Sequence, residues 1–391
     1  MNEALSKLAD DFFKNTLNSS PTSAIMRGYR EYFDQIEELT EARFDQNLKD
    51  LDKFEKRLNE IDFNNLSNKE KVTHGMLEYA FGSNKDSLLD KSWEFGAGVS
   101  GFTGYLIDYN QQMFIPDLES ADLLLKRLEL YNQFFNQVSL VQKKGLDGNR
   151  VATERNILRT IDQIESYLKT SLEEDPLLLV NFSPEVSEED VINWKEKAKL
   201  IIDGYVRPSV NTYLEQLKSE HLPKGRSDMN PGIMWIEGGD DIYLRSLRKF
   251  TGNKDITVQQ VHETGLSEIK RLKKEFLEIG KKVFKDVTTP EEVIYKMQTE
   301  PSMRFESKEQ MLQMAEDTIK RAYEPLADWF TVFPKAPCNV LPVPEESEKH
   351  APPAYYYSPL PDGSRDGTYF LNTYYPVTFC IFVGCVLWSC V

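Results

Sequence analysis

Cysteine is scarce in this sequence. The 391 residues contain four cysteines, and Cys380, Cys385 and Cys390 crowd into the last stretch, so no disulfide framework holds the body of the chain together. The first residues also lack the basic segment and apolar run that mark a secretory signal peptide. Both absences predict a reducing, cytoplasmic setting.

Histidine is equally scarce, and no catalytic constellation is complete. His262 and Glu263 begin the pattern of a zinc peptidase helix, but Leu266 stands where a second histidine would have to face the same metal one turn later. The other three histidines are scattered without ligand-like neighbours. We therefore predict no catalytic residue and no metal ligand in this chain.

Glycines from Gly96 to Gly101 match the spacing of dinucleotide-binding loops. That pattern carries meaning only between a buried strand and a helix, and the residues from Asp90 to Phe95 are not a hydrophobic strand. The pattern therefore indicates a flexible loop.

An excess of positive charge is also missing. Lysine and arginine number 47 against 63 acidic residues, which gives a formal net charge of -16, and no basic stripe appears. A nucleic-acid binder needs clustered basic side chains to displace counterions from phosphates. Nucleic acids and anionic membrane surfaces are therefore poor partners, and a small or peptide-like partner fits better.

The sequence is rich in amphipathic helical patterns. Hydrophobic residues make up 40% and charged residues 28%, as in an ordinary globular protein. Apolar residues recur at three-and-four spacing in three segments, and we predict a mainly α fold, an elongated helical array whose stripes pack helix against helix. The stripes are Leu124, Leu128, Tyr131, Phe135 and Val138; Ile157, Ile161, Ile164 and Leu168; and Val258, Val261, Gly265, Ile269, Leu272, Phe276, Ile279 and Val283.

Capping signals support several helix starts. Two pairs of residues match the capping box, in which side chains bind the free amides of a first turn, and two prolines stand where a helix would begin. The boxes pair Ser67 with Glu70 and Thr257 with Gln260, and the prolines are Pro184, after Ser183, and Pro290, after Thr289.

The pattern changes near Phe333. Prolines alternate with apolar residues up to Pro344, which favours extended chain. The β-favouring runs 355–357 and 368–371 flank a loop with two Asp-Gly pairs, so we predict a long-looped hairpin within a small sheet confined to residues after Phe333. The predicted parts are a helical body over 1–332, this segment over 333–376 and a tail over 377–391.

The tail from Val377 to Val391 contains no charged residue. As a helix it would reach about 22 Å, short of the roughly 30 Å hydrocarbon core of a bilayer. We interpret it as a foreign end, produced by a shifted reading frame or read-through. A buried strand and a membrane tail anchor are the alternatives.

Four segments are similar to one bacterial family. They are Gly145-Leu146-Asp147-Gly148-Asn149-Arg150; Gly238-Gly239-Asp240-Asp241-Ile242-Tyr243; Thr257 through His262-Glu263-Thr264-Gly265-Leu266; and Tyr355-Tyr356-Tyr357 through Asp362-Gly363-Ser364-Arg365 to Tyr369-Phe370-Leu371-Asn372-Thr373. They resemble the "domain of unknown function 885" family, whose members look like helical zinc metallopeptidases. The likeness runs over nearly all of the chain up to Pro376.

The resemblance implies a zinc site in full-length relatives. There, a helix with His-Glu and then Gly-His-His follows the Asn-Thr strand, and a later Glu-Gly-Trp stretch supplies an acidic ligand. This chain diverges near Val377 and has none of these residues, and it reads Asp366 where the family has proline. No cofactor is therefore expected in this chain.

The resemblance also implies substrate-binding residues in the hairpin, namely Tyr356, Arg365, Tyr369 and Asn372. Residues from Tyr369 to Thr373 would form an edge strand that pairs with an extended substrate backbone, and Arg365 would hold a substrate carboxylate through a bidentate pair. In the alternative, Arg365 and Asn372 only organise a loop.

The predicted function is that of a truncated member of a peptidase-like family, inactive as written, with peptides as its partners. One alternative is a pseudoenzyme or regulatory protein that holds peptides without cutting them. Another is a tail-anchored, membrane-associated protein.

Overall fold

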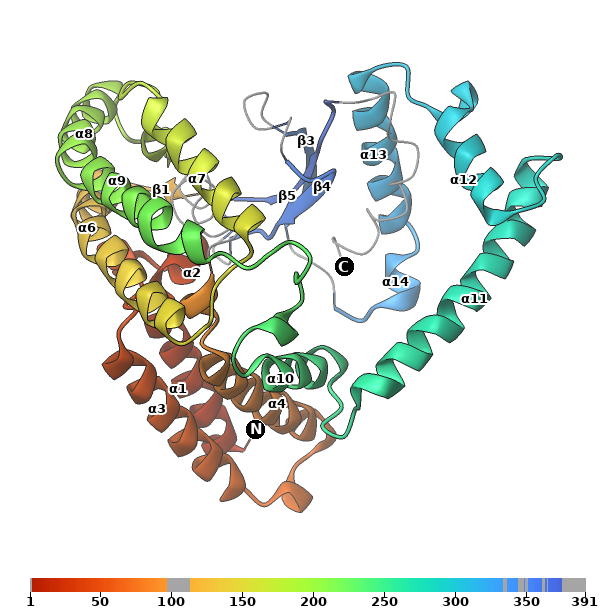
Figure 1. Ribbon diagram of the computed structural model, residues 1–391, viewed down its shortest axis with the longest axis horizontal. Helices are drawn as coiled ribbons and strands as arrows, with labels where there is room; N and C mark the ends of the chain where they lie inside the picture. Colours follow the sequence, from red (N-terminus) through yellow and green to blue (C-terminus); the bar gives the residue numbers. More distant parts are fainter. Residues whose placement is uncertain are drawn as a thin grey trace. The chain divides into compact units, whose positions relative to one another are not determined.

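The computed structural model shows a mainly helical chain with a small sheet near its C-terminal end (Figure 1). This architecture confirms the predicted fold class. The chain divides into two compact units, Met1–Val258 and Gln259–Val391. The structure describes residues 2–96, 113–332, 336–343, 348, 351–360, 363 and 365–374.

The first unit is built of helices around the long helix α6. Helices α8 and α9 pack against α6, α7 packs against α9, and α1, α3 and α4 pack on one another (Figure 1). The helices are α1 (Glu3–Ser19), α2 (Pro21–Met26), α3 (Glu41–Asn59), α4 (Asn68–Asp90), α6 (Leu118–Asp147), α7 (Glu154–Lys169), α8 (Glu188–Ile201), α9 (Arg207–Gln216) and α10 (Gly239–Thr251).

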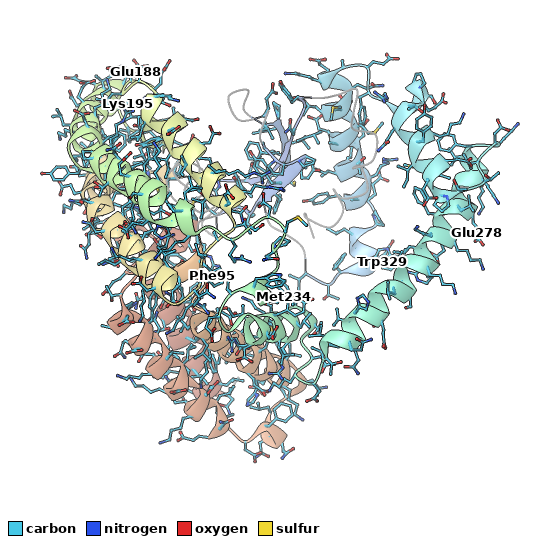
Figure 2. The ribbon with its side chains drawn as sticks, viewed as in Figure 1. Phe95, Glu188, Lys195, Met234, Glu278 and Trp329 are labelled. Carbon is cyan, nitrogen blue, oxygen red and sulfur yellow. The ribbon has the colours of Figure 1, made fainter. Side chains whose placement is uncertain are left out.

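The apolar stripes predicted in this unit form its core. Helix α8 turns Trp194 inward, where its indole Nε1 donates to the carbonyl of Ala121 in α6 over 2.8 Å, whereas Glu188 at the start of α8 is exposed (Figure 2). Both predicted stripes are therefore confirmed as packing faces. Their members in the core are Leu124, Leu128, Tyr131, Phe135, Ile157, Ile161 and Ile164, with Val138 and Leu168 packed at its margin.

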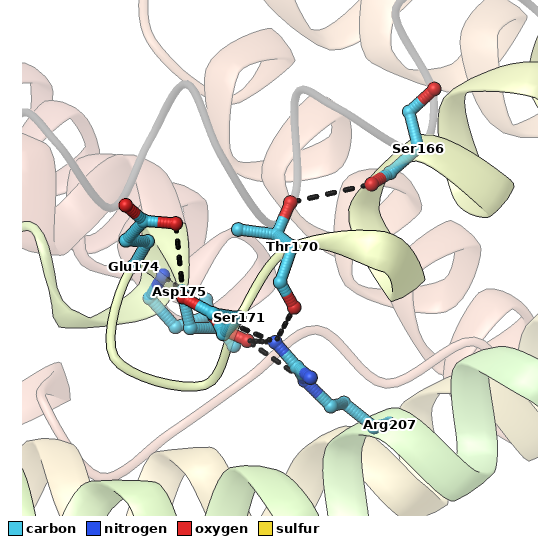
Figure 3. A network of polar contacts seen from close by, with 7 residues as sticks. Ser166, Thr170, Ser171, Glu174, Asp175 and Arg207 are labelled. Carbon is cyan, nitrogen blue, oxygen red and sulfur yellow. Dashed lines mark hydrogen bonds and ion pairs between the residues drawn. The ribbon is translucent and has the colours of Figure 1, made fainter.

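A buried ion pair ties the loop after α7 to α9 (Figure 3). The Asp175 carboxylate accepts from Arg207 Nη2 over 2.8 Å, and the same guanidinium donates to the carbonyls of Thr170 and Ser171. Asp175 also accepts from the backbone amide of Leu177. Because Asp175 is fully buried, these donors replace the water that its charge has lost.

One short strand pair lies outside the predicted region. Strand β1 (Phe114–Ile115) runs parallel to β2 (Asn181–Phe182) in the first unit, so the prediction that strands are confined to residues after Phe333 is wrong. The pairing provides hydrogen-bond partners for backbone groups in two loops. For example, the amide of Asn181 donates to the carbonyl of Met113 over 3.0 Å. Two residues per strand are too few to leave a period-two pattern in the sequence.

The capping signals divide into confirmed and corrected ones. Ser67 and Glu70 form the predicted capping box of α4, and Pro290 opens α12 behind a second box made by Thr289 and Glu292. Pro184 does not open a helix. It lies in a turn closed by the amide of Val186 on the carbonyl of Ser183, and α8 begins four residues later behind Ser187. The box at Thr257 and Gln260 stays a prediction.

Among the described residues, four α-helices precede the sheet of the second unit. They are α11 (Val258–Val283), α12 (Pro290–Thr299), α13 (Lys308–Tyr323) and α14 (Leu326–Trp329). The predicted helix α11 is confirmed, but its predicted packing is wrong within the described residues. Ile269, Leu272, Ile279 and Val283 are between 51% and 60% exposed, and Gly280 is the only buried residue of the helix.

The three-stranded sheet of the second unit has the order β3-β5-β4. Strand β5 (Gly367–Leu371) pairs antiparallel with β4 (Ala354–Tyr357), which confirms the hairpin, and parallel with β3 (Cys338–Pro342), which confirms extended chain there. Helix α13 packs on β3. The buried Ile319 of α13 and Tyr369 of β5 form the small core of this unit.

Two predicted segments fall outside the described residues. They are the glycine loop after Gly96 and the tail from Val377 to Val391. Within the described part of the chain, no helix is both long enough and apolar enough to cross a membrane.

Candidate functional site

The hairpin places two of the predicted site residues on the covered face of the sheet. Tyr356 of β4 lies opposite Tyr369 of β5, so both side chains point to the same side. Tyr369 is only 2% exposed and Tyr356 packs against the same small core. Gly367 makes room for the Tyr356 hydroxyl, because a Cβ there would lie 2.4 Å from it. These tyrosines hold the sheet on its helix.

The opposite face carries an aromatic cluster that was missed from the sequence. Because side chains alternate along a strand, Tyr355 and Tyr357 point away from Tyr356 and share a face with Phe370. Tyr355 stacks on Phe370 with ring centroids 5.1 Å apart, and Tyr357 meets the edge of Phe370 at 5.4 Å. All three side chains are half-buried. We call these three rings the aromatic face.

The Asn372 side chain is hydrogen-bonded to other residues of its own chain. Its side-chain amide donates to the carbonyls of Glu348 and Ala351, at 2.6 and 3.1 Å, and its Oδ1 accepts from the amide of Tyr374. Its backbone amide donates to the carbonyl of Pro353. This geometry matches the loop-organising alternative, since the bonds fix the chain leading into β4.

Arg365 lies at the loop end of the aromatic face. Its Nη2 donates to the carbonyl of Ser358 over 3.2 Å, and its own carbonyl accepts from the amide of Leu360. Burial lowers the pKa of the Arg365 guanidinium, and nearby Tyr357 opposes that change. An arginine remains charged in spite of such a shift, so the structure brings a half-buried cation next to the aromatic face.

The strand order corrects one prediction. Strand β5 is the central strand, so the residues from Tyr369 to Leu371 do not form an edge, and both sides of their backbone are paired. The outer strands of this sheet are β3 and β4. An extended chain could therefore add only beside β3, which has Pro342 and α13 against it, or beside β4, which bears the aromatic face.

The described residues do not fit a catalytic zinc. His262 is exposed on α11 with Leu266 one turn on, and no group of three or more His, Cys, Asp or Glu that could hold a metal occurs within the described ranges.

Two of the family-like segments build a joint in the first unit. Arg150 pairs with the buried Glu94 over 2.7 Å and donates to the carbonyl of Glu237, just before Gly238. Gly145 lies so close to this joint that a Cβ would sit 2.2 Å from the carbonyl oxygen of Glu94. The segments around Gly145 and Gly238 therefore have a structural explanation.

Two solved bacterial protein structures are similar in fold to this chain, and both have low sequence identity to it. A candidate lipoprotein from Colwellia psychrerythraea matches with a TM-score of 0.79 and 17% identity, over 95% of this chain and 68% of that one. A candidate lipoprotein of unknown function from Shewanella oneidensis matches with a TM-score of 0.61 and 15% identity, over 95% of this chain and 65% of that one. These likenesses show the fold alone.

Sequence comparison gives the family. No curated protein matches the chain. The profile of the family described as "Bacterial protein of unknown function (DUF885)" matches residues 21–381, which is most of the chain. The chain therefore belongs to the DUF885 family.

Proposed function

We propose that this chain binds extended peptides at the outer edge of β4 and does not cut them. The aromatic face carries the proposal. Two of its half-buried rings, Tyr355 and Tyr357, lie on the outer strand β4, so they combine apolar contact area with a strand that a peptide can extend. The resemblance to metallopeptidases supports a peptide as the partner.

Arg365 gives the site a direction. A guanidinium binds a carboxylate through two parallel hydrogen bonds, and partial burial strengthens that attraction. We therefore expect peptides with a free C-terminal carboxylate, placed toward the loop end of β4, to bind better than amidated ones.

The binding test uses a mixed library of unstructured peptides and a tight binder selected from it. Changing Tyr355 and Tyr357 together to Ala should weaken binding about tenfold or more, since aromatic anchors dominate such interfaces. Tyr295→Ala, on the exposed side of α12, is the matched control and should leave binding unchanged. Equal affinity of the double variant and the control would contradict the site.

Arg365→Lys keeps the charge and removes the planar fork. It should reduce the preference for free over amidated peptides while leaving the amidated peptide's affinity unchanged. If the wild type binds both forms equally, Arg365 does not contact a carboxylate.

The absence of cleavage is a separate part of the proposal. The chain with Cys380, Cys385 and Cys390 changed to Ser avoids zinc held by stray thiolates. Incubated with the same library and zinc, it should yield no products above a no-protein control. Cleavage that a chelator abolishes would replace binding by peptide hydrolysis.

The cytoplasmic location also stays a prediction. The two similar solved chains are described as candidate lipoproteins, and that description belongs to them. Fractionation of cells expressing this chain decides it, with recovery in the membrane or envelope fraction contradicting the prediction.

A further inference from the structure

Helix α11 presents an apolar face that no described segment of the second unit covers. The side chains along this face are about half exposed, although they are large and lie at core-like spacing. Helix α12 approaches α11 at one flank, where the methyl groups of Val293 contact Gly280 so closely that a Cβ on Gly280 would lie 2.3 Å away. That contact leaves Ile279 and Val283 exposed.

The face follows an unbroken heptad repeat. Eight positions alternate in steps of four and three residues along the helix, which is the period of a two-helix seam rather than of a globular face. Counted as d and a positions in turn, they are Val258, His262, Gly265, Ile269, Leu272, Phe276, Ile279 and Val283. This repeat spans more than three heptads, enough to indicate a coiled coil.

The positions beside the seam complement a second copy of themselves. In a parallel pair, each g residue meets the e residue five positions later on the partner. Glu268 then meets Lys273, and Val261 meets Leu266. An antiparallel pair centred on the same seam would instead bring Glu268 close to Glu275 of the second copy, and these like charges are unfavourable.

We infer that α11 pairs in parallel with α11 of a second copy of this chain. Ile269 at an a position and Leu272 at a d position favour two strands over three or four. The helix is about 39 Å long at 1.5 Å per residue, so one seam can hold all eight core positions. This surface is separate from the sheet proposed to bind peptides.

His262 is the one polar side chain on the seam. A polar residue at a single a position fixes register and strand number and weakens the association. This residue, incomplete as a zinc ligand, therefore has a place in the pairing, and replacing it by an apolar residue should tighten the dimer.

Sedimentation of the full chain over a concentration series tests the pairing. The wild type should pass from monomer to dimer in the micromolar range. Leu272→Glu should raise the dissociation constant on the order of 100-fold, because it buries a charge in the seam. Ser267→Glu adds the same charge on the outer side of α11 and should change little. His262→Val should lower the constant.

Unchanged helical circular dichroism in each variant shows that the fold is intact. A wild type that stays monomeric at the highest concentration overturns the inference. So does a dimer that Leu272→Glu does not weaken, since its interface would then lie elsewhere.

Charge reversal tests the parallel orientation. Glu268→Lys alone places like charges beside the seam and should weaken the dimer several-fold. Adding Lys273→Glu restores opposite charges in a parallel pair and should recover most of the loss. If the double variant is weaker than Glu268→Lys alone, the helices do not run parallel in this register.

Discussion

The two units use the same kind of helix in different ways. In the first unit, the apolar stripes of α6 and α7 meet those of α8 and α9, and one contiguous core of large side chains results. In the second unit, α13 packs on a three-stranded sheet, but the core there is small and α11 leaves its stripe exposed. An amphipathic stripe thus shows that a helix has a partner face, but not where the partner is.

The largest expected difference between the units concerns two tryptophans. Trp194 is 1% exposed in the first unit, and Trp329 is 78% exposed in the second. Trp194→Ala should lower the free energy of unfolding by about 3–5 kcal/mol, through lost burial and the cavity left behind. Trp329→Ala should change it by less than about 0.5 kcal/mol. Urea unfolding of both variants checks the contrast, and equal midpoints would contradict it.

The next contrast compares two ion pairs. Asp175→Asn leaves Arg207 without its buried partner and should lower the free energy of unfolding by about 3 kcal/mol. Glu268→Gln removes a half-exposed partner of Arg271 on α11 and, at protein concentrations where the chain is monomeric, should leave the unfolding midpoint unchanged.

A double variant sharpens this contrast. Replacing both Asp175 and Arg207 by apolar residues of similar size should recover part of the loss, because no buried charge is then left alone. Denaturant unfolding of the double variant measures the recovery. A double variant as unstable as the sum of the single changes would show that the two side chains act independently.

The capping boxes give a smaller contrast. Ser67→Ala and Thr289→Ala each remove the hydroxyl that caps a first turn, at a cost of about 1 kcal/mol. For Ser67 the loss should appear in the unfolding of α1, α3 and α4 together, because α4 belongs to the core that these three helices share. For Thr289 it should appear as faster amide exchange within α12 alone. Exchange spreading from α12 over the sheet would contradict this local effect.

The smallest expected effect is a response to acid. Hydrogen bonds from Ser67 and the amide of Asn2 lower the pKa of the Glu70 carboxyl to about 2, and bonds from Thr288 and Thr289 lower that of Glu292. Each charge therefore stabilises its helix above the ordinary carboxyl pKa, and that stabilisation is lost as the pH falls through the folded-state value.

Helical circular dichroism of the wild type and Glu70→Gln checks the acid response. As the pH falls from about 5 to about 2, the wild type should lose more stability than the variant, which has no charge to lose. Parallel acid curves would show that Glu70 is not held in its charged form.

Much of the fold could be predicted from local sequence patterns, but the pairing of segments far apart in the sequence could not. The sequence predicted the capping box of Ser67 and Glu70 and the apolar stripe that begins at Ile157, because each pattern involves residues only a few positions apart. The central position of β5 was not predictable from the sequence. Its parallel neighbour β3 is separated from it by β4 and a long loop, and no residue pattern within β5 indicates the order of the strands. Likewise, the exposure of Leu272 depends on what packs against α11.

In the candidate site, too, local patterns were predictable from the sequence and contacts between distant segments were not. Alternation in Tyr355-Tyr356-Tyr357 separates two faces, but only the pairing with Phe370 shows which one holds the aromatic face. The bonds of Asn372 to Glu348 and Ala351 depend on a loop fold with no sequence signature.

Amide hydrogen exchange at a low and a high protein concentration tests the contrast between the units most directly. The amides of α6 should exchange slowly and at the same rate at both concentrations, because its core is closed within one chain. Those of α11 should exchange fast at low concentration and slowly at high concentration, because a second copy covers the stripe. Equal protection of α6 and α11 at the lowest concentration would contradict the account.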